Sequence, residues 1–181
     1  MLAAVSVYKA FIYQLSRKKV TTSKPKLSVI IAVKNEEKNI ISLIDSLEKL
    51  NYPNENFEVI IIDDNSSDKT AELINPRISD KNNFIVIKAT NKEFEGKKGA
   101  LSIGIKNAKY NFIVITDADC KHNINWLSAL AGGLDYGYDF VFGIAPILTG
   151  NTLVEKLSAF ENLRNTYLTI AAVGLNLPYS A

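Results

Sequence analysis

Hydrophobic positions along the chain follow two patterns, short unbroken apolar runs and longer segments with apolar residues at helical spacing. The runs show no alternation of apolar and polar residues, which is typical of strands buried on both faces of a parallel sheet. The predicted strands are Leu27–Val33, Phe57–Ile62, Phe84–Lys88, Phe112–Thr116 and Asp139–Ile144.

Helical spacing fills the segments between these runs. Asn35 is a suitable N-cap for the first helix, and Tyr52-Pro53-Asn54 follows its end. A second helix is predicted from the Asp63–Asp68 cluster to about Ile74, and a third begins near Lys97 and carries Leu101, Ile105 and Ala108 on one stripe. Two more are predicted, from Trp126 to about Ala131 and from Leu153 to about Ala172. Because strands and helices alternate, the fold class is α/β, a mainly parallel sheet with helices on both faces.

Polar side chains gather where three of the predicted strands end. They are Lys34-Asn35-Glu36, Asp63–Asp68, and the pair Asp117 and Asp119. The carboxyl ends of parallel strands share one edge of the sheet, where α/β proteins bind ligands. Side chains at i and i+2 of an extended segment leave on the same side, so Asp117 and Asp119 can converge on Mg²⁺ or Mn²⁺. Alternatively, these aspartates cap the following turn.

Lys97 and Lys98 stand at the predicted start of a helix, where cations oppose the helix dipole. A bound phosphate would reverse the sign of this interaction. In the alternative interpretation, the two lysines belong to a solvated loop and are balanced by Glu93 and Glu95. Together with the acids, the lysines match the needs of a nucleoside diphosphate and its cation. His122 either reaches that cation or is solvated.

Composition narrows the classes of function. The chain has 181 residues, of which 47% are hydrophobic and 22% charged, enough for one domain with a sizeable core. The net charge of +2 is too small to indicate a nucleic-acid partner. Because the chain has one Cys and one His, it forms no internal disulfide and no ordinary zinc site, so carboxylates must hold any metal.

The first residues form a separate segment. Leu2–Leu15 is mostly apolar and is followed by Arg17, Lys18 and Lys19. We considered an amphipathic helix on the domain, an interfacial helix, and the end of a membrane helix whose basic flank marks the cytoplasmic side. We expect three regions: 1–26 as this helix and a linker, 27–150 as a nucleotide-sugar-binding domain, and 151–181 as a helix leading to a further part.

Four motifs resemble one known family. LSVIIAVKNEEKNI, FEVIIIDDNSSDKT, GKKGAL and FIVITDADC, between about Leu27 and Gly143, resemble family 2 glycosyltransferases with the GT-A fold, which include membrane-associated polysaccharide synthases. The resemblance implies a nucleoside contact for Ala32, Val33, Asn35 and Glu36, a uracil contact for Asp64, a nucleotide contact for Lys97, a ribose or metal contact for Asp117, and for Asp119 a contact to the metal that bridges the diphosphate.

The resemblance also implies a reaction. A hexosyl or N-acetylhexosaminyl group would pass, with inversion and metal assistance, from a UDP-sugar to a saccharide or lipid-linked acceptor. This would occur at the cytoplasmic face of a membrane, with no nucleic-acid partner. The family's general base and its QxxRW-like motif lie in a later part of the sequence, so we expect the base beyond Ala181. The alternative function is a non-catalytic nucleotide-sugar-binding module or an inactive remnant.

Other nucleotide-dependent or acid-rich α/β families fit the motifs less well. A phosphoacceptor receiver domain needs its acid pair after the first strand, where this chain has Lys34-Asn35. A sugar-nucleotide-forming nucleotidyltransferase needs a loop rich in Gly and Arg at the same place, and a Rossmann dehydrogenase needs GxGxxG there. The sequence AVKNEE meets neither requirement.

Overall fold

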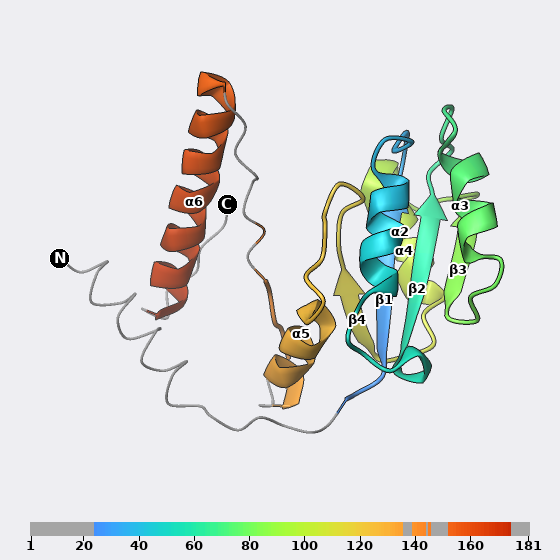
Figure 1. Cartoon of the computed structure of the whole chain (residues 1–181), viewed down its shortest axis with the longest axis horizontal. Coiled ribbons are helices and arrows are strands. Elements are labelled where there is room, and N and C mark those ends of the chain that lie inside the picture. The colour runs from blue at the N-terminus through green and yellow to red at the C-terminus, as the bar shows by residue number, and fades with distance from the viewer. Residues whose placement is uncertain (1–23, 136–138, 144, 146–151, 175–181) are drawn as a thin grey trace. The chain divides into compact units, whose positions relative to one another are not determined.

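The computed structural model describes residues 24–135, 139–143, 145 and 152–174. Within this part of the chain, four parallel strands form a sheet in the order β3-β2-β1-β4 (Figure 1). The strands are β1 (Leu27–Val33), β2 (Phe57–Asp63), β3 (Phe84–Lys88) and β4 (Phe112–Ile115), and the helices are α2 (Ile40–Glu48), α3 (Thr70–Ile78), α4 (Gly96–Lys106), α5 (Trp126–Asp135) and α6 (Leu153–Gly174), with a 3-10 turn at Asn54–Asn56. The predicted α/β class and parallel sheet are confirmed.

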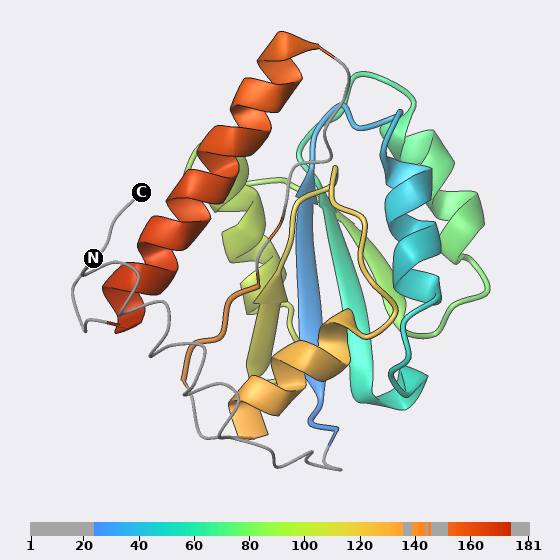
Figure 2. The same cartoon turned by 60° about the vertical axis from the view of Figure 1, so that its left-hand side comes forward.

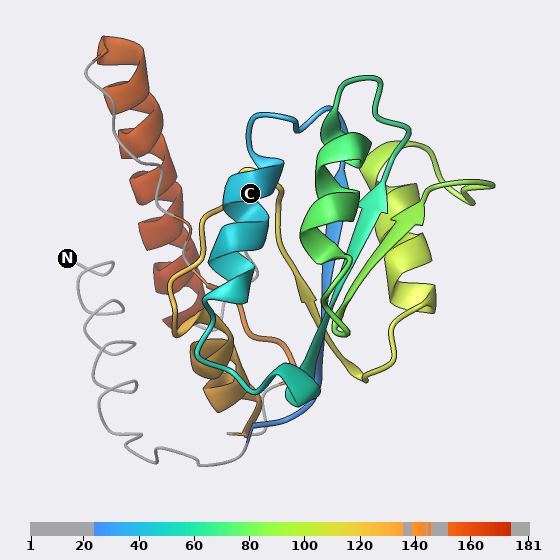
Figure 3. The ribbon, with the colours of Figure 1, turned by 45° about the vertical axis from the view of Figure 1, so that its right-hand side comes forward.

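Helices cover both faces of the sheet, as predicted. Figure 3 shows α2 and α3 in front of the strands and α4 behind them. Because successive residues of a strand point to opposite faces, Ile31 of β1 packs with Leu43 of α2 and Ile74 of α3. Ile30 faces the other way, toward Ala100 of α4. Helix α5 lies on the α2 side, where its Leu127 joins the same core (Figure 2).

The register of the strands places the site. In β1 and β2, Leu27 pairs with Phe57 and Val33 with Asp63, so the two strands end level with each other. Strand β4 runs in the same direction beside β1, and its Phe112 pairs with Leu27. The loops that follow β1, β2 and β4 therefore leave from one edge of the sheet.

Several predicted helix boundaries are wrong. Helix α3 continues past Pro76, because a proline so close to a helix end removes only one backbone hydrogen bond and Ile78 gains a buried position. Helix α5 continues through Gly132 and Gly133 to Asp135, and Gly133 packs against the Val141 side chain.

The burial of two elements also differs from the prediction. Phe112 and Ile115 of β4 are 44% and 49% exposed, because β4 pairs only with β1 among the described residues. On α4, the predicted stripe is partly wrong: Leu101 packs on the core, whereas Ile105 is 47% exposed.

A fifth strand over Asp139–Ile144 is not found. The described residues 139–143 have no strand pairing, and Ile144 lies outside the described part. A short apolar run does not by itself supply the neighbouring strand that a ladder of hydrogen bonds needs.

Residues from Phe142 onward belong to a second unit, whose described helix is α6. The predicted helix from Leu153 is confirmed and extends to Gly174. In the described part of the chain, no helix is both long enough and apolar enough to span a bilayer. The N-terminal segment discussed above, residues 1–23, lies outside the described residues.

Candidate functional site

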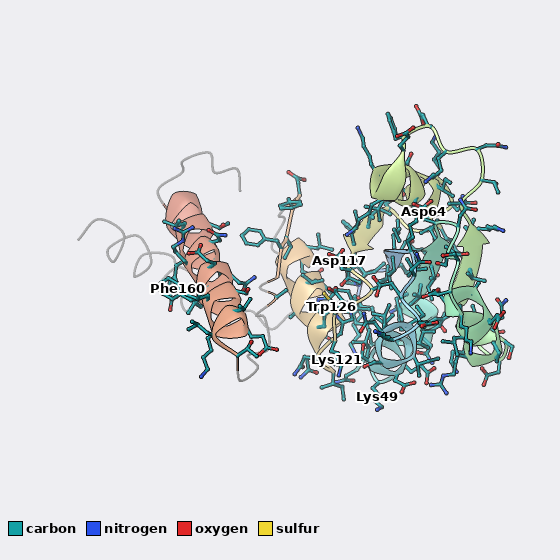
Figure 4. The ribbon with its side chains drawn as sticks, turned by 90° about the horizontal axis from the view of Figure 1, so that it is seen from above. Lys49, Asp64, Asp117, Lys121, Trp126 and Phe160 are labelled. Carbon is teal, nitrogen blue, oxygen red and sulfur yellow. The ribbon has the colours of Figure 1, made fainter. Side chains whose placement is uncertain are left out.

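A pocket of about 270 Å³ opens at the edge of the sheet where β1, β2 and β4 end. Figure 4 looks onto this edge and labels Asp64 and Asp117, which follow β2 and β4. Residues from the three loops and from the start of α4 line the pocket: Ala32, Val33, Lys34, Glu36, Asp64, Gly96, Lys97, Asp117, Ala118 and Asp119. All the binding residues predicted from the sequence, apart from Asn35, therefore line one cavity. The roles assigned to them stay predictions.

Asn35 joins two loops instead of lining the pocket. Its backbone has a positive φ of 57°, and its side-chain Oδ1 accepts hydrogen bonds from the Ser67 N–H at 2.8 Å and from the Ser67 hydroxyl at 3.2 Å. The Asn35 N–H donates to Ser66 Oγ at 3.0 Å. The predicted N-cap role is wrong, because α2 begins only at Ile40. Asn35 instead fixes the β1–α2 loop against the β2–α3 loop.

The next residues of the first loop are bound to the second loop as well. The Glu36 N–H donates to Thr70 Oγ1 at 2.8 Å, and the Glu37 N–H donates to Asp68 Oδ2 at 3.1 Å. Although desolvation raises the pKa of Asp68, hydrogen bonds from Thr70 and from the Glu37 N–H outweigh it, and the pKa lies below its usual value. These contacts hold one wall of the pocket in place before any ligand binds.

The two acids at the end of β2 have different surroundings. Asp63 Oδ1 accepts the Ser66 N–H at 3.0 Å, so this side chain caps the turn. Asp64 lines the pocket, is 4% exposed, and forms an ion pair with Lys92 at 2.5 Å between Nζ and Oδ1. The sequence did not identify Lys92 as a partner of Asp64, because the segment after β3 is recognisable only as a charged loop.

Lys97 and Asp117 meet across the pocket. Lys97 belongs to the first turn of α4, and its Nζ lies 2.5 Å from Asp117 Oδ1. Both side chains remain about half exposed, at 53% and 55%. Asp119 forms no ion pair among the described residues, and its only hydrogen-bond partner there is the Cys120 thiol at 3.8 Å from Oδ1. Of the two aspartates, Asp117 is thus already paired with an ammonium group, whereas Asp119 is not.

The donors at this edge fit a cation that arrives with a diphosphate. No group of three or more His, Cys, Asp or Glu side chains in the described ranges is arranged to hold a metal ion. Magnesium ions usually take one or two protein carboxylates and complete their shell with water and substrate phosphates. Asp119, with Asp117 beside it, can supply these one or two carboxylates.

His122 lies in the loop after these aspartates but does not line the pocket. Its ring stacks on Trp126 with centroids 3.8 Å apart, and its Nε2 lies 3.3 Å from Thr116 Oγ1. Burial lowers the pKa of His122 to about 4, so the ring is neutral near pH 7. The expectation of a solvated histidine is wrong, and the apolar partner that buries it is the Trp126 ring, four residues further along the sequence.

The fold and the pocket together indicate the class of protein to which this chain belongs. Acids and a lysine that converge at the carboxyl edge of a parallel sheet are the arrangement of a nucleotide-binding α/β domain. Residues 28–179 match the model of the glycosyl transferase family 2, and the chain belongs to this family. A curated relative is the beta-monoglucosyldiacylglycerol synthase of Trichormus variabilis, 36% identical over 105 residues, which are 58% of this chain and 22% of the synthase. The chain thus spans about a fifth of that relative's length.

Solved structures agree with this assignment. Staphylococcus aureus TarS (residues 1–349) in complex with UDP-GlcNAc has a TM-score of 0.53 and 33% identity, and the match covers 61% of this chain and 31% of that one. The mannosyltransferase PcManGT of Pyrobaculum calidifontis, in complex with GDP-Man and Mn²⁺, has a TM-score of 0.57 over 91% of this chain and 50% of its own. At 22% identity it supports the fold alone. The predicted GT-A fold is confirmed.

Proposed function

We propose that this chain is the donor-binding part of a glycosyltransferase that uses a UDP-sugar and transfers a hexosyl or N-acetylhexosaminyl group with inversion to a saccharide or lipid-linked acceptor. The observation that carries the proposal is that Asp64, Lys97 and Asp119 line the same pocket. A buried carboxylate suits a nucleobase, and an ammonium group suits a phosphate. An exposed carboxylate suits a cation that is bound to the phosphates.

Each group has a defined task in this proposal. The Asp64 carboxylate accepts a hydrogen bond from the N3–H of uracil, and the chain at Ala32 and Val33 lies against the nucleoside. Lys97 turns from Asp117 toward the diphosphate and stabilises the negative charge that develops on it as the glycosidic bond breaks. Asp119, with Asp117 beside it, would hold Mg²⁺ or Mn²⁺, and the cation would supply further charge neutralisation to the leaving group.

The relatives support the choice of substrates. TarS was crystallised with UDP-GlcNAc, which favours a UDP-linked donor for this chain. The name of the Trichormus variabilis synthase denotes a glucosylated diacylglycerol, which favours a lipid-linked acceptor for this chain. The proposal also includes a place at the cytoplasmic face of a membrane. The same proposal includes Mg²⁺ or Mn²⁺ as the cation.

Calorimetry with UDP, UDP-glucose and UDP-GlcNAc tests the proposal. Asp64→Ala should weaken all three ligands by a similar factor of about 10–100, because each loses the same charge-assisted hydrogen bond to the base. Asp80→Ala is the matched control, since Asp80 is 78% exposed and follows α3 at the opposite end of the sheet. Loss of affinity for only one of the sugars, or no binding of UDP to the unchanged chain, would contradict the proposal.

A further inference from the structure

Lys92 is positioned by the backbone around it. At the end of β3 the Ala89 N–H donates to the Asp63 carbonyl at 2.8 Å, and Asn65 Nδ2 donates to the Ala89 carbonyl at 3.2 Å. These bonds tie the start of the β3–α4 loop to the end of β2. Lys92 therefore lies beside Asp64 because the chain between β3 and α4 is held there.

The far side of the loop rests on α4. A Cβ atom added to Gly99 would lie 1.8 Å from the carbonyl oxygen of Phe94 and 3.1 Å from Lys92 Cβ. Only a residue without a side chain lets the loop approach the first turn of α4 so closely. The Lys98 ammonium lies 4.2 Å from the centre of the Phe94 ring and adds a cation–π contact to the same segment. Lys92 is thus fixed from both directions.

The Lys92–Asp64 pair is the least exposed of the ion pairs found in the described part of the chain. Its side chains are 21% and 6% exposed, compared with 53% and 55% for Lys97 and Asp117. Of the two residues, Asp64 lines the pocket, and Lys92 lies directly beside it outside the lining. Placing charges out of water is unfavourable, and such a pair recovers more when it also bonds a ligand. Asp64 Oδ2 has no hydrogen-bond partner among the described residues.

The pair presents an acceptor beside a donor. Asp64 offers carboxylate oxygens, and the Lys92 ammonium has three N–H donors, of which one reaches Asp64. Uracil presents the complementary order, an N3–H beside a carbonyl, and guanine does so with its N1–H and O6. Cytosine and adenine present a ring nitrogen acceptor beside an amino donor. Against these two bases the carboxylate would meet a lone pair and the ammonium would meet an amino group.

We propose that Lys92 is a specificity-determining residue, which with Asp64 selects a nucleobase with an N–H beside a carbonyl, uracil or guanine, over cytosine and adenine. The proposal rests on the proposed function, because it assumes that a nucleoside diphosphate enters the pocket with its base at Asp64. Lys92 donates to the carbonyl oxygen of the base while Asp64 accepts from the neighbouring N–H. Leaving a charged group unpaired is the penalty that excludes the other bases.

Calorimetry with UDP, GDP, CDP and ADP in the presence of Mn²⁺ tests this on the full chain. UDP or GDP should bind at least about tenfold more tightly than CDP and ADP, since a mismatched charged hydrogen bond discriminates by about this factor or more. Lys92→Met should reduce that preference by about tenfold by weakening the favoured diphosphate, with CDP and ADP little changed. Lys92→Gln, which keeps a polar head but not the charge or the reach, should give the same loss of preference.

Lys106→Met is the matched control. Lys106 is the last residue of α4, is 66% exposed, and pairs with Glu93, the residue that follows Lys92. This variant therefore removes a positive charge beside the loop without touching Asp64. It should leave the ratio of UDP to CDP affinity unchanged. If Lys92→Met and Lys92→Gln retain the wild-type preference, Lys92 only holds Asp64 in place and the inference is wrong while the proposed function stands. If none of the four diphosphates binds to the unchanged chain, the proposed function fails and the inference fails with it.

Discussion

Gly104 sets how closely α4 approaches the sheet. A Cβ atom added at this position would lie 2.4 Å from Ile30 Cγ2 and 2.6 Å from Ile62 Cδ1, both on fully buried side chains of β1 and β2. The same helix begins at Gly96 and carries Lys97 into the pocket. Gly104→Ala therefore perturbs the packing on the sheet of the helix that carries Lys97, the predicted phosphate-binding residue.

Two opposing effects determine how much Gly104→Ala changes the free energy of unfolding. Alanine is favoured over glycine inside a helix by about 1 kcal/mol. Overpacking a filled core costs about 1–3 kcal/mol, and two overlaps with side chains from two strands favour the upper half of that range. Gly104→Ala should then lower the free energy of unfolding by about 1–2 kcal/mol, equivalent to a fall in Tm of roughly 2–8 °C.

Gly132→Ala is the matched control. Gly132 lies inside α5, and no described atom falls within 4 Å of an added Cβ. This variant should gain up to about 1 kcal/mol from helix propensity alone. Urea unfolding followed by circular dichroism measures both variants, and they should differ by about 2–3 kcal/mol. Equal stability of the two variants would refute the close packing of α4 on β1 and β2.

Two further predictions concern single side chains. Lys97→Met should weaken UDP binding about 10–100-fold in calorimetry through the loss of a charge-assisted phosphate contact, whereas Lys98→Met should not; equal effects of the two would contradict the role of Lys97. His122 is the only histidine of the chain, so its proton NMR titration is unambiguous and should give a pKa of about 4. Because the unfolded chain binds this proton near pH 6.5, stability should fall as the pH is lowered from 6.5 to 4; a folded-state pKa near 6.5 would contradict the stacking of His122 on Trp126.

Much of the site was predictable because parallel strands bring their carboxyl ends together. The sequence places Asp64, Asp117 and Asp119 directly after apolar runs, so identifying the strands also identifies the edge at which the acids gather. Strand β1 has the predicted ends because its unbroken apolar run is buried over almost its whole length. Strand β3 also has the predicted ends, although only Phe84 of its residues is buried.

Features set by loop conformation were not predictable. Asn35 turns its side chain to Ser67 because its backbone adopts a positive φ, which no periodicity encodes. The contact of Lys92 with Asp64 depends on the close approach of a loop to Gly99, and the sequence shows only a charged segment. Hydrophobic patterns describe which face of an element is buried, whereas loop geometry depends on contacts between distant residues.

In the proposed function, Asp119 would hold the cation that accompanies the diphosphate of the donor. Calorimetry of UDP binding with and without Mn²⁺, on the unchanged chain and on Asp119→Ala, tests this role of Asp119, with Asp80→Ala as the control. We predict that Mn²⁺ strengthens UDP binding to the unchanged chain and to the control by at least about tenfold, and that Asp119→Ala loses this dependence and keeps its fold. Equal UDP affinity of the unchanged chain with and without Mn²⁺ would contradict the claim.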